Sequence, residues 1–462
     1  MYKYRFFTTG DGTVGLYDPN IDDIYHSAAG AATEALTKFV LPACIAHCIG
    51  KNTDIKVLDL CYGIGYNSKV FLNYILKNFL KNKNKFFEKH KNALSPYIGK
   101  IHSDNVPKMR YSGKIYTDNE FLEDIRNKCS FSIYSDNNLK ELNNKNYIMN
   151  MHEDGLRNKI FIDAVDNNPE LSLISPFIIS KQKSIKNKSD FKNSKILKYL
   201  KLKNNDLPKE YHQYLCCSKA LNLYLLEELI PMYQGYYSAI QNILTDTKYT
   251  NYFDPAICRL FKFYFSDKYS RNLGWTLSAF LHNIYYKYLS IRHKNDLKAL
   301  NMLNIKIKMN FDDARNYLSD NTSKYNIIFL DAFTPSKAPE LWTLDFFKLL
   351  YKHLDDDGII LTYSSAAPVR NAFINSGFYV GKLYNQFENK YFGTIASKDE
   401  KLIENKLSRY EIELLNTKAG IMYRDLDLNL NRAEILKARQ DEFNSSELIS
   451  SSTYKKQFNN KN

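Results

Sequence analysis

Short apolar runs alternate with helical patterns in two separate parts of the chain. Residues 55–60 form a mostly apolar run, and from Lys69 to Leu76 the apolar side chains recur at the spacing of a helix. A further strand is predicted at 160–165. The last third of the chain repeats the alternation, with predicted strands at 305–309, 325–331 and 358–363, predicted helices at 343–354 and 367–376, and a closing antiparallel pair at 378–382 and 391–396. Strands that alternate with helices form a mostly parallel sheet covered on both faces, so we predict a doubly wound α/β fold.

Two segments interrupt this alternation. Residues 81–159 are rich in Lys, Asn and Asp without a clear period, and a similar stretch at 181–206 leads into a helical region. We therefore expect insertions at about 81–159 and 181–280 within a domain that spans residues 57–400. Residues 1–56 are interpreted as a hairpin and a helix that cap the ligand site, and residues 401–462 as a C-terminal extension with a partly disordered tail.

Residues 10–15 spell the G-x-G-x-x-G pattern of a dinucleotide site. A true site of this kind requires a buried strand before the glycines and a helix after them, and the sequence indicates neither. We predict a β-hairpin at this position instead.

Four carboxylates fall at or just beyond the ends of predicted strands: Asp59, Asp166, Asp313 and Asp331. Ligands of a parallel sheet bind at this carboxyl edge, so we expect the four side chains to converge there. Asp166, which closes the strand at 160–165, is placed to accept hydrogen bonds from ribose hydroxyl groups. An aspartate that favours the following Asn-Asn-Pro turn explains this position equally well.

The amino-acid composition excludes fewer classes of protein than the order of apolar and polar residues does. The formal net charge of +14 favours a polyanionic partner such as RNA, although a codon bias toward Lys and Asn would produce the same excess. The seven cysteines include no CxxC pair, which argues against a disulfide framework and a zinc site. No run approaches the roughly 18 apolar residues of a membrane span, and no apolar signal core is present, so we expect a cytoplasmic protein without a membrane segment.

The turn after the first strand of the sheet points to a family. Residues 59–65, Asp-Leu-Cys-Tyr-Gly-Ile-Gly, resemble the cofactor turn of class I S-adenosylmethionine-dependent methyltransferases, with Cys61 in place of the first glycine. Glycines in such a turn let the backbone approach a ligand closely, and the helix that follows offers unpaired N–H groups. The resemblance implies a Rossmann-like methyltransferase fold.

The loop at 331–343, Asp-Ala-Phe-Thr-Pro-Ser-Lys-Ala-Pro-Glu-Leu-Trp-Thr, is more specific. Together with 25–34 and 362–370 it resembles the methyltransferase domain of the MnmC family, over roughly residues 7–76, 160–170 and 280–435. The chain looks closest to the stand-alone form of that family, which methylates the 5-aminomethyl group of the tRNA wobble uridine. The resemblance implies S-adenosyl-L-methionine as methyl donor, tRNA as partner, and no metal. We expect no FAD, because the sequence shows no second dinucleotide fingerprint and no room for a flavin domain after residue 435, so a separate enzyme would make the aminomethyl group.

The resemblance also assigns roles to single residues. Asp331 would be the catalytic residue, because a primary alkylamine has a pKa of about 10 and must lose a proton before it attacks, while a carboxylate can hold and orient it. The residues that would bind the donor are Asp59, Gly63, Gly65, Asn67, Asp166, Asp313, Ala314, Tyr25 and Glu34. Those that would contact the acceptor are Phe333, Pro335 and Lys337. A methyltransferase for another amine and a non-catalytic RNA-binding protein on the same fold are the alternatives.

Overall fold

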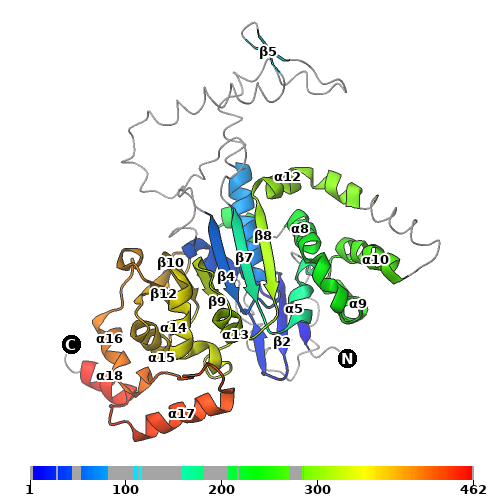
Figure 1. Cartoon of the computed structure of the whole chain (residues 1–462). Coiled ribbons are helices and arrows are strands. Elements are labelled where there is room, and N and C mark those ends of the chain that lie inside the picture. The colour runs from blue at the N-terminus through cyan, green and yellow to red at the C-terminus, as the bar shows by residue number, and fades with distance from the viewer. Residues whose placement is uncertain are drawn as a thin grey trace.

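A seven-stranded sheet forms the centre of the molecule (Figure 1). The computed structural model describes residues 4–27, 30–43, 54–81, 109–111, 114–116, 159–179, 207–215, 218–269, 284 and 286–459. The order across the sheet is β11-β12-β10-β9-β4-β7-β8. Its strands are β4 (Ile55–Leu60), β7 (Ile160–Val165), β8 (Ile305–Asn310), β9 (Tyr325–Leu330), β10 (Leu354–Thr362), β11 (Tyr379–Asn385) and β12 (Lys390–Ser397). The first five run parallel to one another, and β12 pairs antiparallel with both β10 and β11, which confirms the predicted doubly wound sheet and its closing pair.

The winding of the chain reverses beside β4. From β4 the chain moves outward through β7 to β8, and it then returns to the other side of β4 and continues through β9 to β10. Leu60 therefore has parallel partners on both sides, Val165 of β7 and Leu330 of β9. In doubly wound sheets, ligands bind at this reversal, beyond the carboxyl ends of the strands. Those ends point toward the lower part of Figure 1, where β2 lies.

Hydrophobic clusters cover both faces of the sheet. Val57 and Leu58 are neighbours in β4, and each is fully buried in a different cluster, because successive side chains of a strand point to opposite faces. One face packs against the helix over residues 66–81. The other packs against α13 (Ala314–Ser319), α14 (Leu344–His353) and α15 (Ala367–Asn375).

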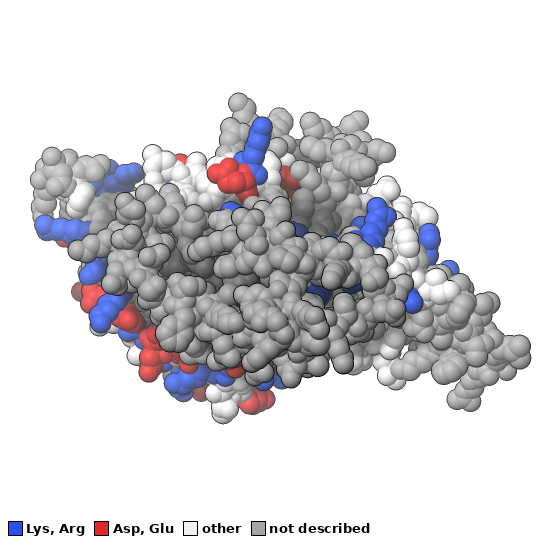
Figure 2. All heavy atoms as spheres, turned by 90° about the horizontal axis from the view of Figure 1, so that it is seen from above, with Lys and Arg blue, Asp and Glu red and all other residues white. Residues whose placement is uncertain are grey.

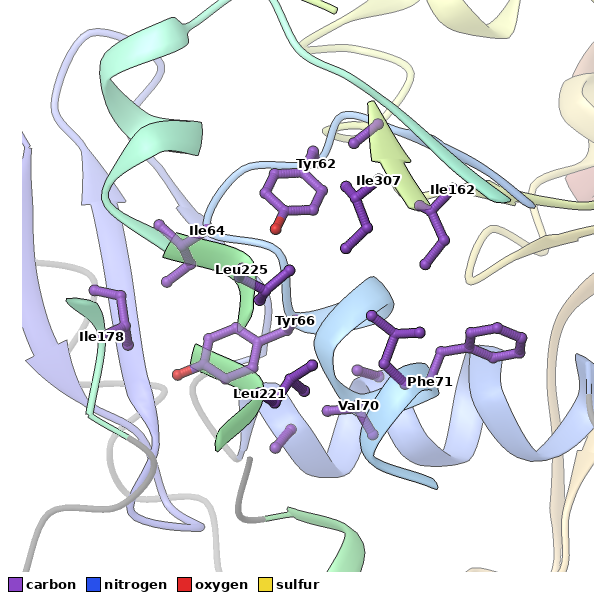
Figure 3. Close-up of a cluster of buried hydrophobic side chains, with 14 of the residues drawn as sticks. Tyr62, Ile64, Tyr66, Val70, Phe71, Ile162, Ile178, Leu221, Leu225 and Ile307 are labelled. Atoms are coloured by element: carbon purple, nitrogen blue, oxygen red, sulfur yellow. The ribbon is translucent and has the colours of Figure 1, made fainter. Parts of the chain in front are cut away.

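Part of the expected second insertion belongs to the core. Leu221 and Leu225 of α8 (Lys219–Leu229) lie in one buried cluster with Ile162 and Ile307 of the sheet (Figure 3). Helices α9 (Tyr237–Thr245) and α10 (Pro255–Tyr269) follow on the same side of the molecule, beside the edge strand β8. Of the first insertion, the structure describes chiefly the paired strands β5 (Met109–Tyr111) and β6 (Lys114–Tyr116). Most of 81–159 and all of 181–206 lie outside the described residues.

The N-terminal segment forms a small antiparallel sheet of β1 (Arg5–Thr8), β2 (Val14–Asp18) and β3 (Asp23–Tyr25). The G-x-G-x-x-G sequence is the turn between β1 and β2, where the carboxylate of Asp11 accepts hydrogen bonds from Thr9 and Thr13. The predicted hairpin is thus confirmed. The chain then continues into α1 (Ala31–Glu34) and a π-helical turn, η1 (Ala35–Val40).

The C-terminal extension is helical where the sequence predicted a partly disordered tail. It contains α16 (Arg409–Leu415), α17 (Arg432–Ser445) and α18 (Ser451–Asn459). Helix α17 begins with a reciprocal capping box between Asn431 and Glu434, and Ile435 is its single fully buried residue. A helix with so narrow an apolar contact has no clear hydrophobic stripe, which is why the pattern did not predict it.

The surface mixes charges of both signs. Seen from above, Lys and Arg side chains alternate with Asp and Glu along one flank of the described part (Figure 2). The net positive charge of the chain is therefore not gathered into one patch along that flank. Within the described residues, no helix combines the length and apolarity of a membrane span.

Candidate active site

A tight turn joins the end of β4 to the helix over residues 66–81. Its backbone has left-handed φ values at Cys61 (63°), Gly63 (54°) and Gly65 (78°). A Cβ atom on Gly65 would lie 2.3 Å from the hydroxyl oxygen of Tyr62 and 2.8 Å from Oγ of Ser175, so a side chain does not fit there. Cys61 adopts the conformation that a glycine adopts freely, so this departure from the usual sequence leaves the path of the turn intact.

The carboxylate of Asp166, just after β7, binds the glycine turn. Oδ2 accepts a hydrogen bond from the backbone N–H of Gly63 at 2.7 Å, and Oδ1 accepts one from the N–H of Asn168 at 2.8 Å. Burial raises the pKa of Asp166 to about 6, although both hydrogen bonds act to lower it. The bond to Asn168 agrees with the turn interpretation of this residue, and its role toward a ribose stays a prediction.

Asp59 is buried inside β4 with half of its hydrogen-bonding capacity unused. Oδ2 accepts a hydrogen bond from Oγ of Ser68 at 2.5 Å, whereas Oδ1 has no partner among the described residues. Burial raises the pKa of Asp59 to about 7, and the nearby charge of Asp331 adds to this effect. A buried acceptor without a partner is costly unless a ligand supplies the donor.

Asp331 directly follows β9 and faces the helix of the glycine turn. Oδ2 accepts a hydrogen bond from Nδ2 of Asn67 at 2.9 Å and lies 3.4 Å from Nδ1 of His26. Burial acts to raise the pKa of Asp331, but the close contact with His26 and the hydrogen bond from Asn67 outweigh it and hold the pKa below its ordinary value. Both contacts fall on Oδ2, so the described residues leave Oδ1 available to a substrate.

The segment after β3 closes over this carboxylate. His26 has 6% of its side chain exposed and a left-handed φ of 63°, an uncommon conformation that its surroundings must hold in place. Glu34 accepts hydrogen bonds from the N–H of Ser27 and from Nζ of Lys38, each at 2.5 Å. Glu34 therefore fixes the backbone next to His26.

Tyr25 joins the acceptor loop to the glycine turn. Its ring packs edge-on against Phe333, with centroids 4.8 Å apart, and lies within 3.3 Å of where a Cβ of Gly63 would stand. Lys337 ties the same loop to the turn before β3 by donating to the backbone oxygen of Ile21 at 2.6 Å. Pro335 lies between these anchors and is half-buried. The predicted acceptor residues thus share one loop that contacts the N-terminal segment.

Asp313 and Ala314 lie at the same edge of the sheet but belong to a separate network. Asp313 caps α13, and its Oδ2 lies 2.8 Å from Nη2 of Arg315. Burial acts to raise the pKa of Asp313, but the hydrogen bonds from Arg315 outweigh it and lower the pKa. Ala314 is buried beside it. Much of the Asp313 carboxylate is therefore already engaged, and its role beside an adenine stays a prediction.

Sequence analysis did not single out His26, Lys38 or Tyr363 as site residues. The Tyr363 hydroxyl donates to the backbone oxygen of Ala332 at 2.8 Å, and Nζ of Lys38 lies 5.9 Å from the centroid of the Tyr363 ring. His26 and Tyr363 fall within stretches that carried the family resemblance, but isolated polar residues carry no periodic signal. Their proximity to Asp331 arises only from the packing of distant segments.

Comparison with known proteins shows which class of enzyme this chain is similar to. Residues 276–399 match a family model described as S-adenosyl-L-methionine-dependent methyltransferase. The bifunctional tRNA 5-methylaminomethyl-2-thiouridine biosynthesis protein MnmC of Burkholderia vietnamiensis is 37% identical over 71 residues, which cover 15% of this chain and 11% of MnmC. The chain carries an MnmC-like methyltransferase domain. The predicted resemblance and the predicted class of enzyme are thereby confirmed.

Two further relatives are similar to this methyltransferase. An uncharacterised protein of Methanocaldococcus jannaschii is 30% identical over 173 residues, which cover 36% of this chain and 48% of that protein. The crystal structure of MnmC2 from Aquifex aeolicus aligns with 96% of this chain and 87% of its own, at a TM-score of 0.46 and 18% identity. The sequence matches to both curated relatives thus span less than half of each relative.

The residues at the carboxyl edge fit S-adenosyl-L-methionine as donor. This molecule carries positive charge on its sulfonium and its α-ammonium group, and the edge presents the buried carboxylate of Asp59 and the partly exposed carboxylates of Asp166 and Asp331. Oδ1 of Asp59 and Oδ1 of Asn67 are buried acceptors without a partner among the described residues, so N–H groups of a bound donor would satisfy them. The described residues contain no group of three His, Cys, Asp or Glu side chains able to hold a metal ion.

Replacing Asp59 by Asn should stabilise the folded protein and weaken donor binding. Because the folded pKa of about 7 exceeds the ordinary value of 3.8, the folded state binds more protons than the unfolded state between these values, and stability falls as pH rises across this range. Asparagine removes the buried charge, so we expect a gain of about 1–3 kcal/mol at pH 8 and a loss of about tenfold in donor affinity. Thermal melts at pH 5 and pH 8, with calorimetry of donor binding, test both effects. If the variant melted at a lower temperature than wild type at pH 8, burial of the charged Asp59 carboxylate would not destabilise the folded protein, and the prediction would be wrong.

Proposed function

We propose that this methyltransferase moves a methyl group from S-adenosyl-L-methionine to the 5-aminomethyl group of the wobble uridine of tRNA, forming 5-methylaminomethyl(-2-thio)uridine. The carboxylate of Asp331 carries the proposal, because it is held at the glycine turn with Oδ2 engaged and Oδ1 available. The similarity to MnmC, a protein named for tRNA 5-methylaminomethyl-2-thiouridine biosynthesis, points to the acceptor. Since that match covers a small part of MnmC, tRNA and its aminomethyl group belong to the proposal.

The charges of the site suit an amine acceptor. An alkylamine is protonated at neutral pH and cannot attack until a proton leaves. Oδ1 of ionised Asp331 would accept a hydrogen bond from this ammonium group, hold its nitrogen, and pass the released proton to water, while Asn67 keeps the carboxylate in place. S-adenosyl-L-methionine supplies a methyl group on a positively charged sulfur that leaves as a neutral thioether. Positioning therefore contributes more than strong basicity.

His26 is a positioning residue for Asp331. Burial acts to lower the pKa of His26, but the close contact with Asp331 and the charges of Asp331, Glu34 and Asp59 outweigh it, so the pKa lies above 6.5. Below this pKa the imidazolium neutralises Asp331 and competes with a cationic amine. Above it the carboxylate is free to bind the acceptor, and we expect kcat to rise with pH through this range.

Replacing His26 by Gln should remove that titration and lower kcat by about tenfold, because the carboxylate loses one of its two anchors. Donor affinity should change by less than about threefold, since His26 contacts Asp331 rather than the orphan acceptors. Measuring kcat and KM between pH 6 and pH 9 separates the two effects. An unchanged pH profile in the variant would show that His26 does not govern the charge of Asp331.

Methylation of tRNA in vitro tests the proposed function. The purified protein is incubated with S-adenosyl-L-methionine and tRNA that carries 5-aminomethyl(-2-thio)uridine, and the nucleosides are separated by mass spectrometry. We expect one added methyl group on that nucleoside, and none on control tRNA that lacks the aminomethyl group. Transfer to small amines but not to tRNA would favour a methyltransferase for another amine. Failure to bind the donor would favour a non-catalytic RNA-binding protein.

The reaction also implies an earlier step. Because methylation consumes an aminomethyl group, another enzyme must first install it, and we assign that step to a separate protein of the cytoplasm. The glycine turn after β4 joins a buried parallel strand to a helix, as a nucleotide site requires. We propose that the chain works on this one nucleotide-bearing donor, without FAD or a metal.

A further inference from the structure

The hairpin of β11 and β12 extends past the carboxyl edge of the sheet. Thr394 of β12 pairs with Thr362, the last residue of β10, and Lys390 at the start of β12 lies four positions before Thr394. At roughly 3.3 Å per residue the hairpin reaches about 13 Å beyond the end of β10. Gly393 packs where a Cβ would lie 3.3 Å from Cα of Tyr363, the residue after β10. The base of the extension therefore lies against the rim of the site.

Two exposed tyrosines face each other across this extension. Tyr384 and Tyr391 are directly paired, their ring centroids are 5.2 Å apart, and they are 44% and 52% exposed. Nζ of Lys382 lies 4.4 Å from the centroid of the Tyr391 ring. Nζ of Lys382 also forms an ion pair with Glu411 at 2.9 Å, which fixes the lysine beside the Tyr391 ring. We call Lys382, Tyr384 and Tyr391 the hairpin platform.

The backbone of this hairpin is already paired on its outer side. The N–H of Lys382 donates to the backbone oxygen of Asn405 at 2.7 Å, and Gly381 forms a bridge with Lys406. A partner strand could not add to β11 at this point, because its hydrogen-bonding groups are taken. The exposed rings of Tyr384 and Tyr391 thus offer a partner ring surface, which is the chemistry that stacks on a nucleobase, while Lys382 holds the Tyr391 ring in place.

We propose that the hairpin platform stacks a nucleobase of the single-stranded RNA segment that flanks the target nucleotide. The proposal rests on the proposed function, since it places a neighbour of the wobble uridine beside a site rim that also holds Asp331. The link to the rim is continuous: Gly393 packs against Tyr363, whose hydroxyl binds the backbone of Ala332 next to Asp331. One partner surface can therefore span both places.

The chain supplies a matched control for this platform. Tyr379 lies on the same strand and is 48% exposed, but it pairs with Ser397, which is aligned with Ile359 in the interior of β10. It therefore lies on the side away from the carboxyl edge. Replacing Tyr379 by Ala removes the same exposed ring from the same hairpin without touching the platform.

The test compares wild type, the Tyr384→Ala, Tyr391→Ala double variant, the matching Phe double variant and Tyr379→Ala. The measurements are KM for aminomethyl tRNA and the dissociation constant of a labelled anticodon stem-loop. Since loss of a stacked base weakens binding by about five- to a hundredfold, we expect the Ala double variant to raise both constants at least about tenfold. The Phe double variant and Tyr379→Ala should stay within about twofold of wild type, with kcat and donor affinity unchanged throughout.

Two outcomes would overturn the platform. If the Ala double variant binds and methylates tRNA like wild type, or if Tyr379→Ala is equally impaired, the stacking site is wrong while the proposed function stands. Wild type that neither binds nor methylates tRNA would instead overturn the proposed function and the platform with it. The difference between the Ala double variant and wild type could instead depend on protein concentration. If the oligomeric state changed with it, the tyrosines would contact a second copy of this chain.

Discussion

Replacing Asp331 by Asn should lower kcat for methyl transfer by about 10²–10⁴-fold and leave the dissociation constant of S-adenosyl-L-methionine within about threefold of wild type. Asparagine has nearly the same shape and can still contact Asn67, so the packing of the site is retained. What it lacks is the negative charge that attracts and orients a cationic amine at Oδ1. The loss should therefore appear in the reaction and not in donor binding.

The measurement pairs steady-state kinetics on tRNA with calorimetry of donor binding. Asp356→Asn is the matched control, because Asp356 lies in the same sheet, on β10, with 92% of its side chain exposed. This control should have wild-type kinetics. Equal losses of turnover and donor affinity in the Asp331 variant would make this residue a donor ligand or a structural residue and would remove the basis of the proposed mechanism.

The sheet and its site edge followed from the sequence because they depend on local pattern. The strands at 55–60, 160–165 and 325–330 are short apolar runs, and the structure contains them as β4, β7 and β9. A parallel sheet then brings their carboxyl ends together without any further information. The convergence of Asp59, Asp166 and Asp331 is a consequence of topology, and topology was predictable.

Other features of the site depend on contacts that the pattern does not encode. His26 lies beside Asp331 through a left-handed backbone conformation, which no periodicity predicts for a histidine. The partners of Asp313 illustrate the same limit. Its carboxylate reads as a free strand-end acid in the sequence, but Arg315 binds it and also reaches Asp425 in the C-terminal extension.

The C-terminal extension shows what composition alone does not reveal. Its charged residues suggested a partly disordered tail, yet several of them make specific contacts with the sheet domain. Glu411 of α16 pairs with the buried Arg370 at 2.8 Å and with Lys382 at 2.9 Å. Charges that are paired across elements can fix a segment, whereas the sequence shows only that they are charges.

Asp425 gives the largest expected effect on stability. It is fully buried; Oδ2 accepts a hydrogen bond from Nη1 of Arg315 at 2.7 Å, and Oδ1 accepts hydrogen bonds from the N–H groups of Asn429 and Leu430 at 3.0 Å each. Replacing it by Ala leaves three donors without their acceptor. Removing one partner of a buried ion pair costs about 3–5 kcal/mol, so we expect the free energy of unfolding to fall by that amount.

The control for this variant lies two residues away. Asp427 is exposed, so Asp427→Ala should change the free energy of unfolding by less than about 0.5 kcal/mol. Denaturant unfolding of both variants, followed by donor binding at a temperature where each is folded, separates the two roles of the network. Because Arg315 would then pair with Asp313 alone, donor affinity should change in the Asp425 variant only if Asp313 contacts the donor. A destabilised variant with wild-type affinity would make Asp313 a structural cap of α13, and a destabilisation no larger than that of Asp427→Ala would mean that the extension is not fixed through Asp425.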